Sequence, residues 1–443
     1  MRSFLFHAAP SAVSLFLFSG CDVQGSIEIA DKVGEDPDAD ADADSDSDSD
    51  GDGDTDTDSD SDSDSDTDVP DPVPDFVVDC FGSGDFELIQ DAINAATSPA
   101  DIALKACKYH ERIDYLGKDL NIYGIEGSAN TTIDGDDGGT VVNVETRESG
   151  HTRLAGVTIT GGSDYEAGGA IEMATSSLEL EDIVIEGNYG LEMIQVYGGN
   201  LDVIDVTIEG NSYVEGGSAL WVDGGSLNVS QSNIDCDNGT NGIWHHVQLI
   251  LADSDINCDG GYAVQDYHGE DYVLRSRLYG GISAYLAYDN ESTVEEPDNP
   301  NELWMAESSV FGGGSIGADI RYMQPDVENS IFYGATSGLS MLTCSSDSQV
   351  KSSVFADSAC GITSDLATSI TYSAFWNNTA DTCGLTVRNG ITDDPLFVSW
   401  PFDMHLDPAS PLVDAGDPDS SNDDADGSRN DIGIYGGALP ALF

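Results

Sequence analysis

Side chains that are suited to binding recur about once per repeat in the middle of this 443-residue chain. Each directly follows an apolar residue whose alternation with its neighbours is typical of a strand, so we expect the apolar residue to face inward and its successor outward. The predicted inward residues are Ile171, Ile194, Leu220, Ile243, Val264, Ile320, Leu339 and Ile362. The outward residues that follow them are Glu172, Gln195, Trp221, Trp244, Gln265, Arg321, Ser340 and Thr363.

Trp221 and Trp244 are the most informative outward residues, because two exposed indoles on adjacent turns form a surface on which sugar rings can stack. Gln195 and Gln265 flank them, Glu172 lies beyond, and we include all of these with Arg321 in a predicted glycan-binding strip. The alternative is a cross-strand aromatic pair that only stabilises a sheet.

Three histidines, His245, His246 and His268, lie near this strip. His245 alternates inward beside Trp244, which indicates a hydrogen-bonded core or turn histidine rather than a catalytic base. The longest insertion, Asp289–Leu303, leaves the repeats close by and is expected to form one wall of a groove.

A sequence motif that repeats along the chain must position these residues. It begins as Leu154-Ala-Gly-Val-Thr-Ile, recurs at Leu180 and Val203, and continues in degenerate form to Ile370, with successive copies starting 20 to 31 residues apart. A sustained period in the twenties indicates a solenoid. The alternating β-branched residues favour short strands over leucine-rich repeats. The pairs Gly161-Gly162, Gly187-Asn188 and Gly210-Asn211 predict tight turns with left-handed backbone.

The segment before the repeats predicts how the solenoid begins. Phe86 to Ala96 has apolar residues at helical spacing, and such a helix would cover the open edge of a first coil. The sequence from Tyr109 to Gly127, followed by Thr132-Ile-Asp-Gly, resembles the N-terminal region of the pectin-lyase-like superfamily. The repeats themselves predict an all-β, single-stranded parallel β-helix of about ten or more coils, with this helix as its N-terminal cap. The resemblance implies in addition that the β-helix is right-handed. It does not imply one activity, because the superfamily includes lyases, hydrolases, esterases and adhesins.

We therefore divide the folded part into a cap with the first coils (76–153), the β-helix repeats (154–384) and a C-terminal cap (385–443).

The first 20 residues are typical of a secretory signal, and Ser19-Gly20-Cys21 resembles a bacterial lipoprotein signal. That resemblance implies that Cys21 is lipidated and that residues 21–35 form the lipidated N-terminal segment. Residues 36–75 are an Asp/Ser/Thr-rich stalk that cannot bury a core and is expected to be extended and disordered. We thus expect an exported protein, lipid-anchored at the bacterial cell envelope, at the outer membrane or the cell surface.

The positions of the cysteines predict disulfides, which indicates that the protein is located in an oxidising compartment. Cys236 and Cys258 follow the same apolar phrase on adjacent coils, and Cys360-Gly-Ile-Thr aligns with Cys383-Gly-Leu-Thr, so each pair is expected to form a disulfide. A third bridge, Cys80–Cys107, would tie the entry region to the first coil, and Cys344 remains without an assigned partner.

The excess of acidic residues limits the classes of ligand that the folded part can bind. Removing the 23 acidic and 2 basic residues before Phe76 leaves 60 acidic against 12 basic residues. This balance excludes nucleic acid and disfavours polyanionic glycans. We expect a monomer that binds a neutral or weakly charged glycan or cell-surface polymer.

No cofactor is required, although Asp424, Asp426 and Asp431 surround a Gly turn and offer oxygen ligands for a structural calcium ion. The alternative is an acidic turn capped by its own side chains.

Catalytic motifs are hard to assign in so acidic a chain. The Asn-Thr-Asp, Asp-Asp, Gly-His-Gly and Arg-x-Lys elements of a polygalacturonase-like site do not occur in that order in the coils. We therefore assign no catalytic residue and expect a non-catalytic carbohydrate-binding, adhesive or structural role. The alternative is a lyase or glycoside hydrolase that uses the same face. Convergent carboxylates beside Trp221 would favour the enzyme.

Overall fold

The computed structural model describes residues 73–145, 152–236, 239–288, 301–334, 336–365 and 368–438, without the side chain of Glu166. The predictions for the signal, Cys21 and the stalk fall on residues 1–72, and most of the Asp289–Leu303 insertion is residues 289–300; both lie outside the described residues. Within those residues, no helix is both long enough and apolar enough to cross a membrane.

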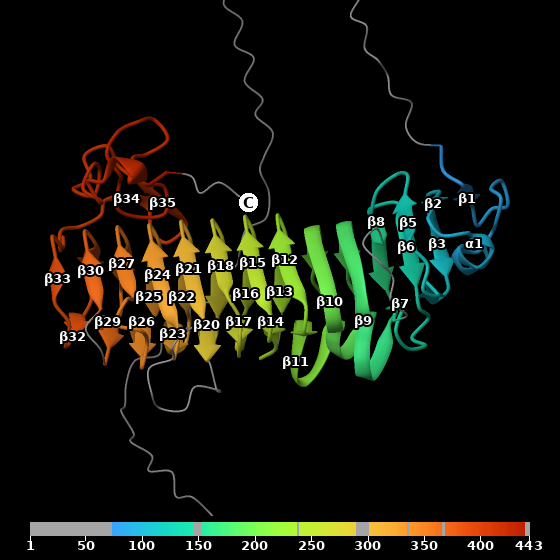
Figure 1. The fold of residues 1–443 in the computed structure, drawn as a ribbon, viewed down its shortest axis with the longest axis horizontal. Coiled ribbons are helices and arrows are strands. Elements are labelled where there is room, and N and C mark those ends of the chain that lie inside the picture. The colour runs from blue at the N-terminus through green and yellow to red at the C-terminus, as the bar shows by residue number, and fades with distance from the viewer. Residues whose placement is uncertain are drawn as a thin grey trace, which may run out of the picture. The chain divides into compact units, whose positions relative to one another are not determined.

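The described chain is a parallel β-solenoid of about 12 turns, which confirms the predicted fold class (Figure 1). From β11 onward each coil contributes one strand to each of three parallel sheets, so that a strand pairs with the strand three places further along the chain. Side chains directed inward from all three sheets form one continuous apolar core along the coils.

The first sheet carries the predicted strip. Its repeat strands are β11 (Ser212–Asp223), β14 (Asn241–His245), β17 (Tyr262–Asp266), β20 (Ser283–Tyr288), β23 (Ile316–Arg321), β26 (Ser337–Leu342), β29 (Cys360–Ser364) and β32 (Ala380–Cys383). The second sheet contains β12 (Ser226–Ser230), β15 (Gln248–Ala252), β18 (Asp271–Leu274), β21 (Glu302–Ala306), β24 (Gln324–Glu328), β27 (Gln349–Lys351), β30 (Ser369–Thr371) and β33 (Val387–Arg388). The third contains β13 (Asn233–Cys236), β16 (Asp255–Cys258), β19 (Arg277–Gly280), β22 (Ser309–Gly312), β25 (Ile331–Gly334), β28 (Val354–Ala356) and β31 (Ala374–Trp376).

The first coils are formed by strands that supply the same three sheets. They are β1 (Phe76–Val78), β2 (Ala100–Leu104), β3 (Cys107–His110), β4 (Ile113–Asp114), β5 (Leu120–Gly124), β6 (Thr131–Asp134), β7 (Val142–Val144), β8 (Arg153–Thr160), β9 (Ser163–Ile185) and β10 (Tyr189–Ile208). The last two are long because they run through successive sheets without a break; β10 alone pairs with β11, β12 and β13.

The predicted capping helix is present as α1 (Ile89–Ala95) and buries Ile89, Ala92 and Ile93 in the core at the N-terminal end of the rod (Figure 1). Its first turn is capped from a distance, because the Glu111 carboxylate accepts hydrogen bonds from the N–H groups of Ile89 and Gln90 at 2.7 and 3.0 Å. These bonds satisfy donors that a helix start leaves unpaired.

A buried serine ladder explains why Ser recurs in the degraded repeats. The ladder consists of Ser232, Ser254, Ser276, Ser308, Ser330, Ser353 and Ser373 on successive coils. Each hydroxyl after that of Ser232 accepts from the N–H of the preceding serine of the ladder, at 3.1 to 3.4 Å. The residue before each serine has a positive φ, as Asp253 (51°) and Glu307 (51°) illustrate. The predicted glycine turns at Gly161, Gly187 and Gly210 are also left-handed, whereas these non-glycine turns were not predicted.

The C-terminal segment packs against the side of the rod. Phe311, Ile331 and Val354 of the third sheet form a second apolar cluster with Met404 and Leu412, and the hairpin of β34 (Phe397–Ser399) and β35 (Asp403–Leu406) lies beside these coils (Figure 1). The short 3-10 helix Ser420–Asn422 belongs to the same segment. Residues 385–443 were predicted to cap the last coil; the described part covers a lateral face, because outward aromatic side chains there need burial.

Candidate functional site

Strand pairing confirms the inward and outward assignment for most of the strip. Ile171, Ile194, Leu220, Ile243 and Val264 are fully buried and in register. The outward row therefore runs, one residue per coil, through Glu172, Gln195, Trp221, Trp244, Gln265, Leu286, Asp319, Ser340 and Thr363.

Arg321 does not belong to this row, so its predicted register was wrong. Asp319 occupies the row, and Arg321 lies two residues further along β23, opposite Tyr288. Its guanidinium nevertheless reaches back to the Asp319 carboxylate, with Nη2 and Oδ2 2.7 Å apart. The shift arises because Ala318, and not Ile320, pairs with Leu339. Ala318 and Ile320 are both fully buried, so an alignment by apolar residues could not distinguish them.

The two tryptophans form part of an aromatic ladder, which we define as Tyr197, Trp221, Trp244, His246 and Tyr267. The Trp221 and Trp244 rings are parallel within 9°, with centroids 5.3 Å apart, and the ring of Tyr197 meets Trp221 edge-on at 4.8 Å. His246 and Tyr267 contact Trp244 at 4.4 and 5.3 Å. The indole faces are thus turned toward one another along the rod, whereas a sugar-stacking platform needs faces turned to solvent.

A carboxyl cluster adjoins the ladder, and we define it as Glu145, Glu172 and Glu192 together with Gln195 and Tyr197. The amide of Gln195 donates hydrogen bonds to Glu192 Oε2 at 3.4 Å and to the Tyr197 hydroxyl at 3.1 Å. Glu192 and Gln195 are only 6% and 4% exposed, whereas Tyr197 is 45% exposed. The cluster therefore presents one open phenol above buried polar groups.

Two carboxyl groups of the cluster, the half-buried Glu172 and the buried Glu192, have raised pKa values. Burial, together with the neighbouring Glu145 and Asp164 carboxylates, raises the pKa of Glu172 to about 7. Burial raises the pKa of Glu192 to about 7 as well. The pKa of Tyr197 is also raised, by burial and by the charges of Glu192 and Glu172, so both carboxyl groups lie close enough to act on this phenol. Sequence reasoning missed Glu192 and Tyr197, whose proximity depends on the bend of β10.

We expect Glu172→Gln to change the pH dependence of stability. The pKa of Glu172 is raised in the folded state, so its contribution to stability is present below pH 4.5 and is lost as the pH rises to about 7. The variant should melt about 1–3 °C above the wild type at pH 8 and equally at pH 4.5. Scanning calorimetry at both pH values measures this. Glu215→Gln, at an exposed position of β11, is the control, and a difference of equal size at both pH values would contradict the prediction.

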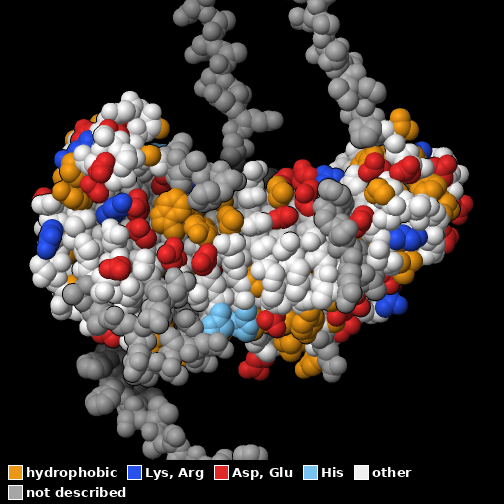
Figure 2. Space-filling model, viewed as in Figure 1, with side chains coloured by type: hydrophobic (Ala, Val, Ile, Leu, Met, Phe, Trp, Pro, Cys, Tyr) orange, Lys and Arg blue, Asp and Glu red, His pale blue; other side chains and the backbone are white. Residues whose placement is uncertain are grey.

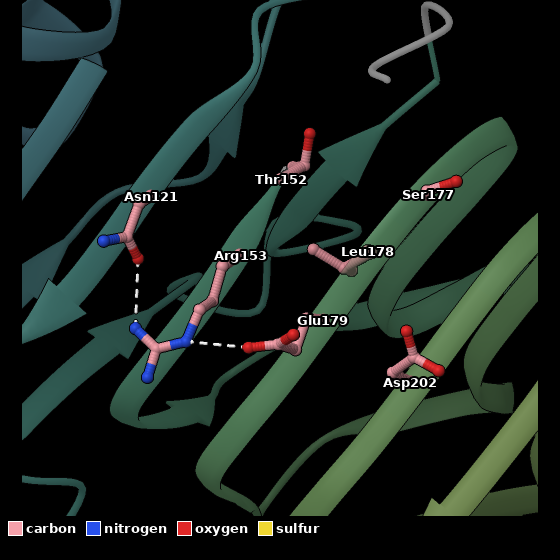
Figure 3. A pocket seen from close by; sticks show the side chains of 7 residues that line it. All are labelled: Asn121, Thr152, Arg153, Ser177, Leu178, Glu179 and Asp202. Carbon is pink, nitrogen blue, oxygen red and sulfur yellow. Dashed lines mark hydrogen bonds and ion pairs between the residues drawn. The ribbon is translucent and has the colours of Figure 1, made fainter. Parts of the chain in front are cut away.

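The described residues contain two open polar hollows elsewhere. One, of about 300 Å³, is lined by Asn121, Thr152, Arg153, Ser177, Leu178, Glu179 and Asp202 (Figure 3). Its only cation is satisfied internally, since Arg153 bonds Asn121 at 3.0 Å and pairs with Glu179 at 3.0 Å and with Glu181. The other, of about 720 Å³, is lined by ten residues between Ser346 and Arg388 near the last coils.

The predicted calcium ligands do not converge in the structure. Asp424 Oδ1 accepts from the N–H of Gly437 at 2.6 Å, Asp426 Oδ1 from Ser428 at 2.8 Å, and Asp431 Oδ1 from Asp414 at 2.6 Å. Each carboxylate thus accepts a backbone N–H: Asp426 caps its own turn, as in the alternative stated above, whereas Asp424 and Asp431 accept from residues 13 and 17 positions away. Calcium binding there stays a prediction.

The structure contains the three expected disulfides, Cys80–Cys107, Cys236–Cys258 and Cys360–Cys383, and leaves Cys344 as a buried thiol. Cys236 and Cys258 are direct partners on β13 and β16. The predicted alignment of the last pair was wrong, because Cys360 is opposite Ala380 and Cys383 is opposite Thr363. The bridge forms across this offset, with the Cα atoms 6.2 Å apart.

Comparisons with known proteins give fold likenesses only. No family model matches the sequence, and no curated protein matches it. Three similar solved structures are the Streptococcus pneumoniae surface protein and adhesin PfbA (10% identity, 69% of this chain and 92% of that one, TM-score 0.42), pectate lyase Pel9A (13%, 79% and 91%, 0.35) and the Azotobacter vinelandii mannuronan C-5 epimerase AlgE6 A-module (12%, 69% and 93%, 0.32). At these values the likenesses assign no activity. The chain is a parallel β-helix protein by its own strand pairings.

Proposed function

We propose that the protein binds a neutral or weakly charged glycan across the carboxyl cluster and the adjoining aromatic ladder. The observation that carries this proposal is the grouping of Glu172, Glu192 and Gln195 beneath the exposed ring of Tyr197. Partly protonated carboxyl groups both donate and accept hydrogen bonds, as sugar hydroxyls require, and an exposed aromatic ring supplies apolar contact. Glycan contact is therefore assigned to Tyr197 and to the outer edges of the indoles, rather than to the indole faces.

The charge of the surroundings selects among glycans. Acidic side chains are scattered over the visible face of the rod, with few basic ones (Figure 2). The folded part retains 60 acidic against 12 basic residues, so a polyanionic chain would be repelled. Single sites of this kind are weak, and an array of sites on a polymer or clustered surface raises the effective affinity.

A glycan panel tests the proposal with the full-length protein. We expect retention of a neutral polysaccharide, and we expect Gln195→Ala and Tyr197→Ala each to weaken binding by about tenfold, which corresponds to about 1.4 kcal/mol. Thr363→Val is the matched control, since Thr363 lies in the same outward row on a distant coil. Failure to retain any glycan, or equal losses in all three variants, would contradict the proposal.

A second candidate function is glycoside hydrolysis, which one observation favours: two carboxyl groups, Glu172 and Glu192, each have a pKa raised to about 7. Hydrolysis needs a protonated acid and an ionised base or nucleophile on either side of a glycosidic bond. Analysis of a bound glycan for new reducing ends separates the two functions. If the protein is a hydrolase, Glu172→Gln and Glu192→Gln should each lower product formation by a factor of about 100 or more while the glycan stays bound.

We further propose that Cys21 carries a lipid and that the acidic stalk holds the rod away from the membrane. The support is the Ser19-Gly20-Cys21 sequence followed by 17 Asp between residues 36 and 68. Cys21→Ser is expected to move the protein from the membrane fraction to the soluble fraction after cell disruption. Unchanged membrane association would contradict this anchor without affecting glycan binding.

A further inference from the structure

A cluster of polar side chains lies inside the apolar core, directly beneath the aromatic ladder. It consists of His245 at the end of β14, Asp266 at the end of β17, Asp271 at the start of β18 and Tyr285 in β20, with exposed fractions of 0%, 1%, 0% and 0%. Three of these strands belong to the first sheet and lie on three consecutive coils, and β18 follows in the second sheet. Burial of ionisable groups at such a depth is costly unless they are paired or bind a metal.

The imidazole of His245 is oriented as a ligand. Its Nδ1 lies 3.1 Å from the carbonyl oxygen of Val247, a bond in which Nδ1–H donates, and this leaves the lone pair of Nε2 free. Nε2 faces Asp271 Oδ2 at 3.5 Å. Neither Nε2 nor Asp271 Oδ1 has a hydrogen-bond partner among the described residues, although both atoms are buried. Two buried acceptors of the same cluster are thus unsatisfied.

The two aspartates complete a ligand set. One ligand atom each from His245, Asp266 and Asp271 can be chosen so that all three lie within 4.8 Å of one another. Asp266 is held in place, since its Oδ1 accepts from the N–H of His268 at 2.8 Å. The Tyr285 hydroxyl donates to Asp271 Oδ2 at 2.5 Å and so orients the second carboxylate from outside the set.

Charge balance identifies the missing partner. Two ionised aspartates beside a neutral imidazole carry two negative charges, and a proton on the imidazole removes only one of them. A divalent cation removes both and also satisfies Nε2 and Asp271 Oδ1. We propose that His245, Asp266 and Asp271 bind a divalent metal ion of the zinc class, because an imidazole nitrogen among the ligands favours Zn²⁺ over Ca²⁺. The ion would tie two consecutive coils together, because Asp266 and Asp271 belong to the coil that follows the coil of His245.

A bound proton is the rival occupant. Burial lowers the pKa of His245, but the charges of Asp271 and Asp266 outweigh it and raise that pKa to about 9, so without a metal the imidazole is a cation. With either occupant the cluster holds a positive charge, and the two possibilities differ in whether that charge is a proton or a metal ion.

Elemental analysis of the full-length protein, purified without chelator, decides between them. We expect about one equivalent of zinc that survives dialysis, a lower melting temperature after chelation, and recovery when Zn²⁺ alone is added. X-ray absorption at the zinc edge should show nitrogen and oxygen ligands with one imidazole. A protein without metal whose melting temperature does not respond to Zn²⁺ would overturn the proposal and leave the proton as occupant.

Matched variants locate the ion. His245→Gln and Asp271→Asn should each reduce bound zinc at least tenfold. The control is His110→Gln, because His110, Asp134 and Asp136 form the other three-residue group of this composition among the described residues, yet His110 and Asp136 are exposed and Asp134 pairs with Lys108. Loss of zinc in His110→Gln, with retention in His245→Gln, would assign the metal to the surface and overturn the proposal. Should the core variants not fold, the metal content and absorption spectrum of the wild type still decide.

Discussion

Phe355→Ala is expected to lower the free energy of unfolding by about 3–5 kcal/mol, the range for a buried aromatic residue cut back to alanine. Phe332, Phe355 and Phe375 stack on three consecutive strands of the third sheet, with centroids 5.3 and 5.2 Å apart and ring planes within 12° and 17°. Phe355 is the middle ring and is fully buried. Its removal leaves a cavity and deprives both neighbours of a stacked partner.

The surroundings of this ring offer little room to collapse. A side chain on Gly361 would already come within 3.1 Å of both Phe355 and Phe375, so the backbone there is packed directly against the rings. Urea denaturation measures the loss, and Phe402→Ala, at a position 76% exposed, should cost less than about 0.5 kcal/mol. Because coils contact mainly their neighbours, the C-terminal coils of the variant should unfold before the rest. A loss below 1 kcal/mol for Phe355→Ala would mean that the stack is not packed as described.

The pair Trp221 and Trp244 is expected to be energetically coupled. Each single alanine substitution should cost about 1–3 kcal/mol, below the range for a fully buried aromatic residue because both side chains are only partly buried. The double variant should cost less than the sum by about 0.5–1.5 kcal/mol, the contribution of a stacked pair beyond area burial. The parallel rings at 5.3 Å are the reason. Chemical denaturation of the two single variants and the double variant gives the cycle.

This cycle also tests the prediction that sugars stack on the indole faces. If the rings mainly hold each other, the double variant melts several degrees below the wild type, and Tyr197→Ala weakens glycan binding more than Trp244→Ala does. An unchanged melting temperature of the double variant, together with abolished glycan binding, would instead restore the sugar-stacking prediction. Tyr197 distinguishes the two outcomes because its ring is exposed and it belongs to both the aromatic ladder and the carboxyl cluster.

The sequence alone determined the features that repeat. The period in the twenties and the alternation around Ile194 and Leu220 predicted the parallel β-helix and the buried face of each strand, because every coil must bury the same positions against its neighbours. The inward direction of His245 follows from the same alternation, and the structure confirms it. Cysteines on neighbouring coils were paired for the same reason.

Tertiary structure decided what alternation cannot encode. A strand has a side-chain period of two, so a register error of two residues keeps each side chain on its face and goes unnoticed; this is why Arg321 was placed in a row that Asp319 occupies. Ring orientation depends on the neighbours above and below, so the sequence could place Trp221 and Trp244 side by side without revealing that their faces meet. Glu192 reaches Gln195 past a register shift in β10, and Asp271 reaches His245 from another sheet. Those groupings arise from coil geometry, in which residues from different strands meet at distances that no local pattern records.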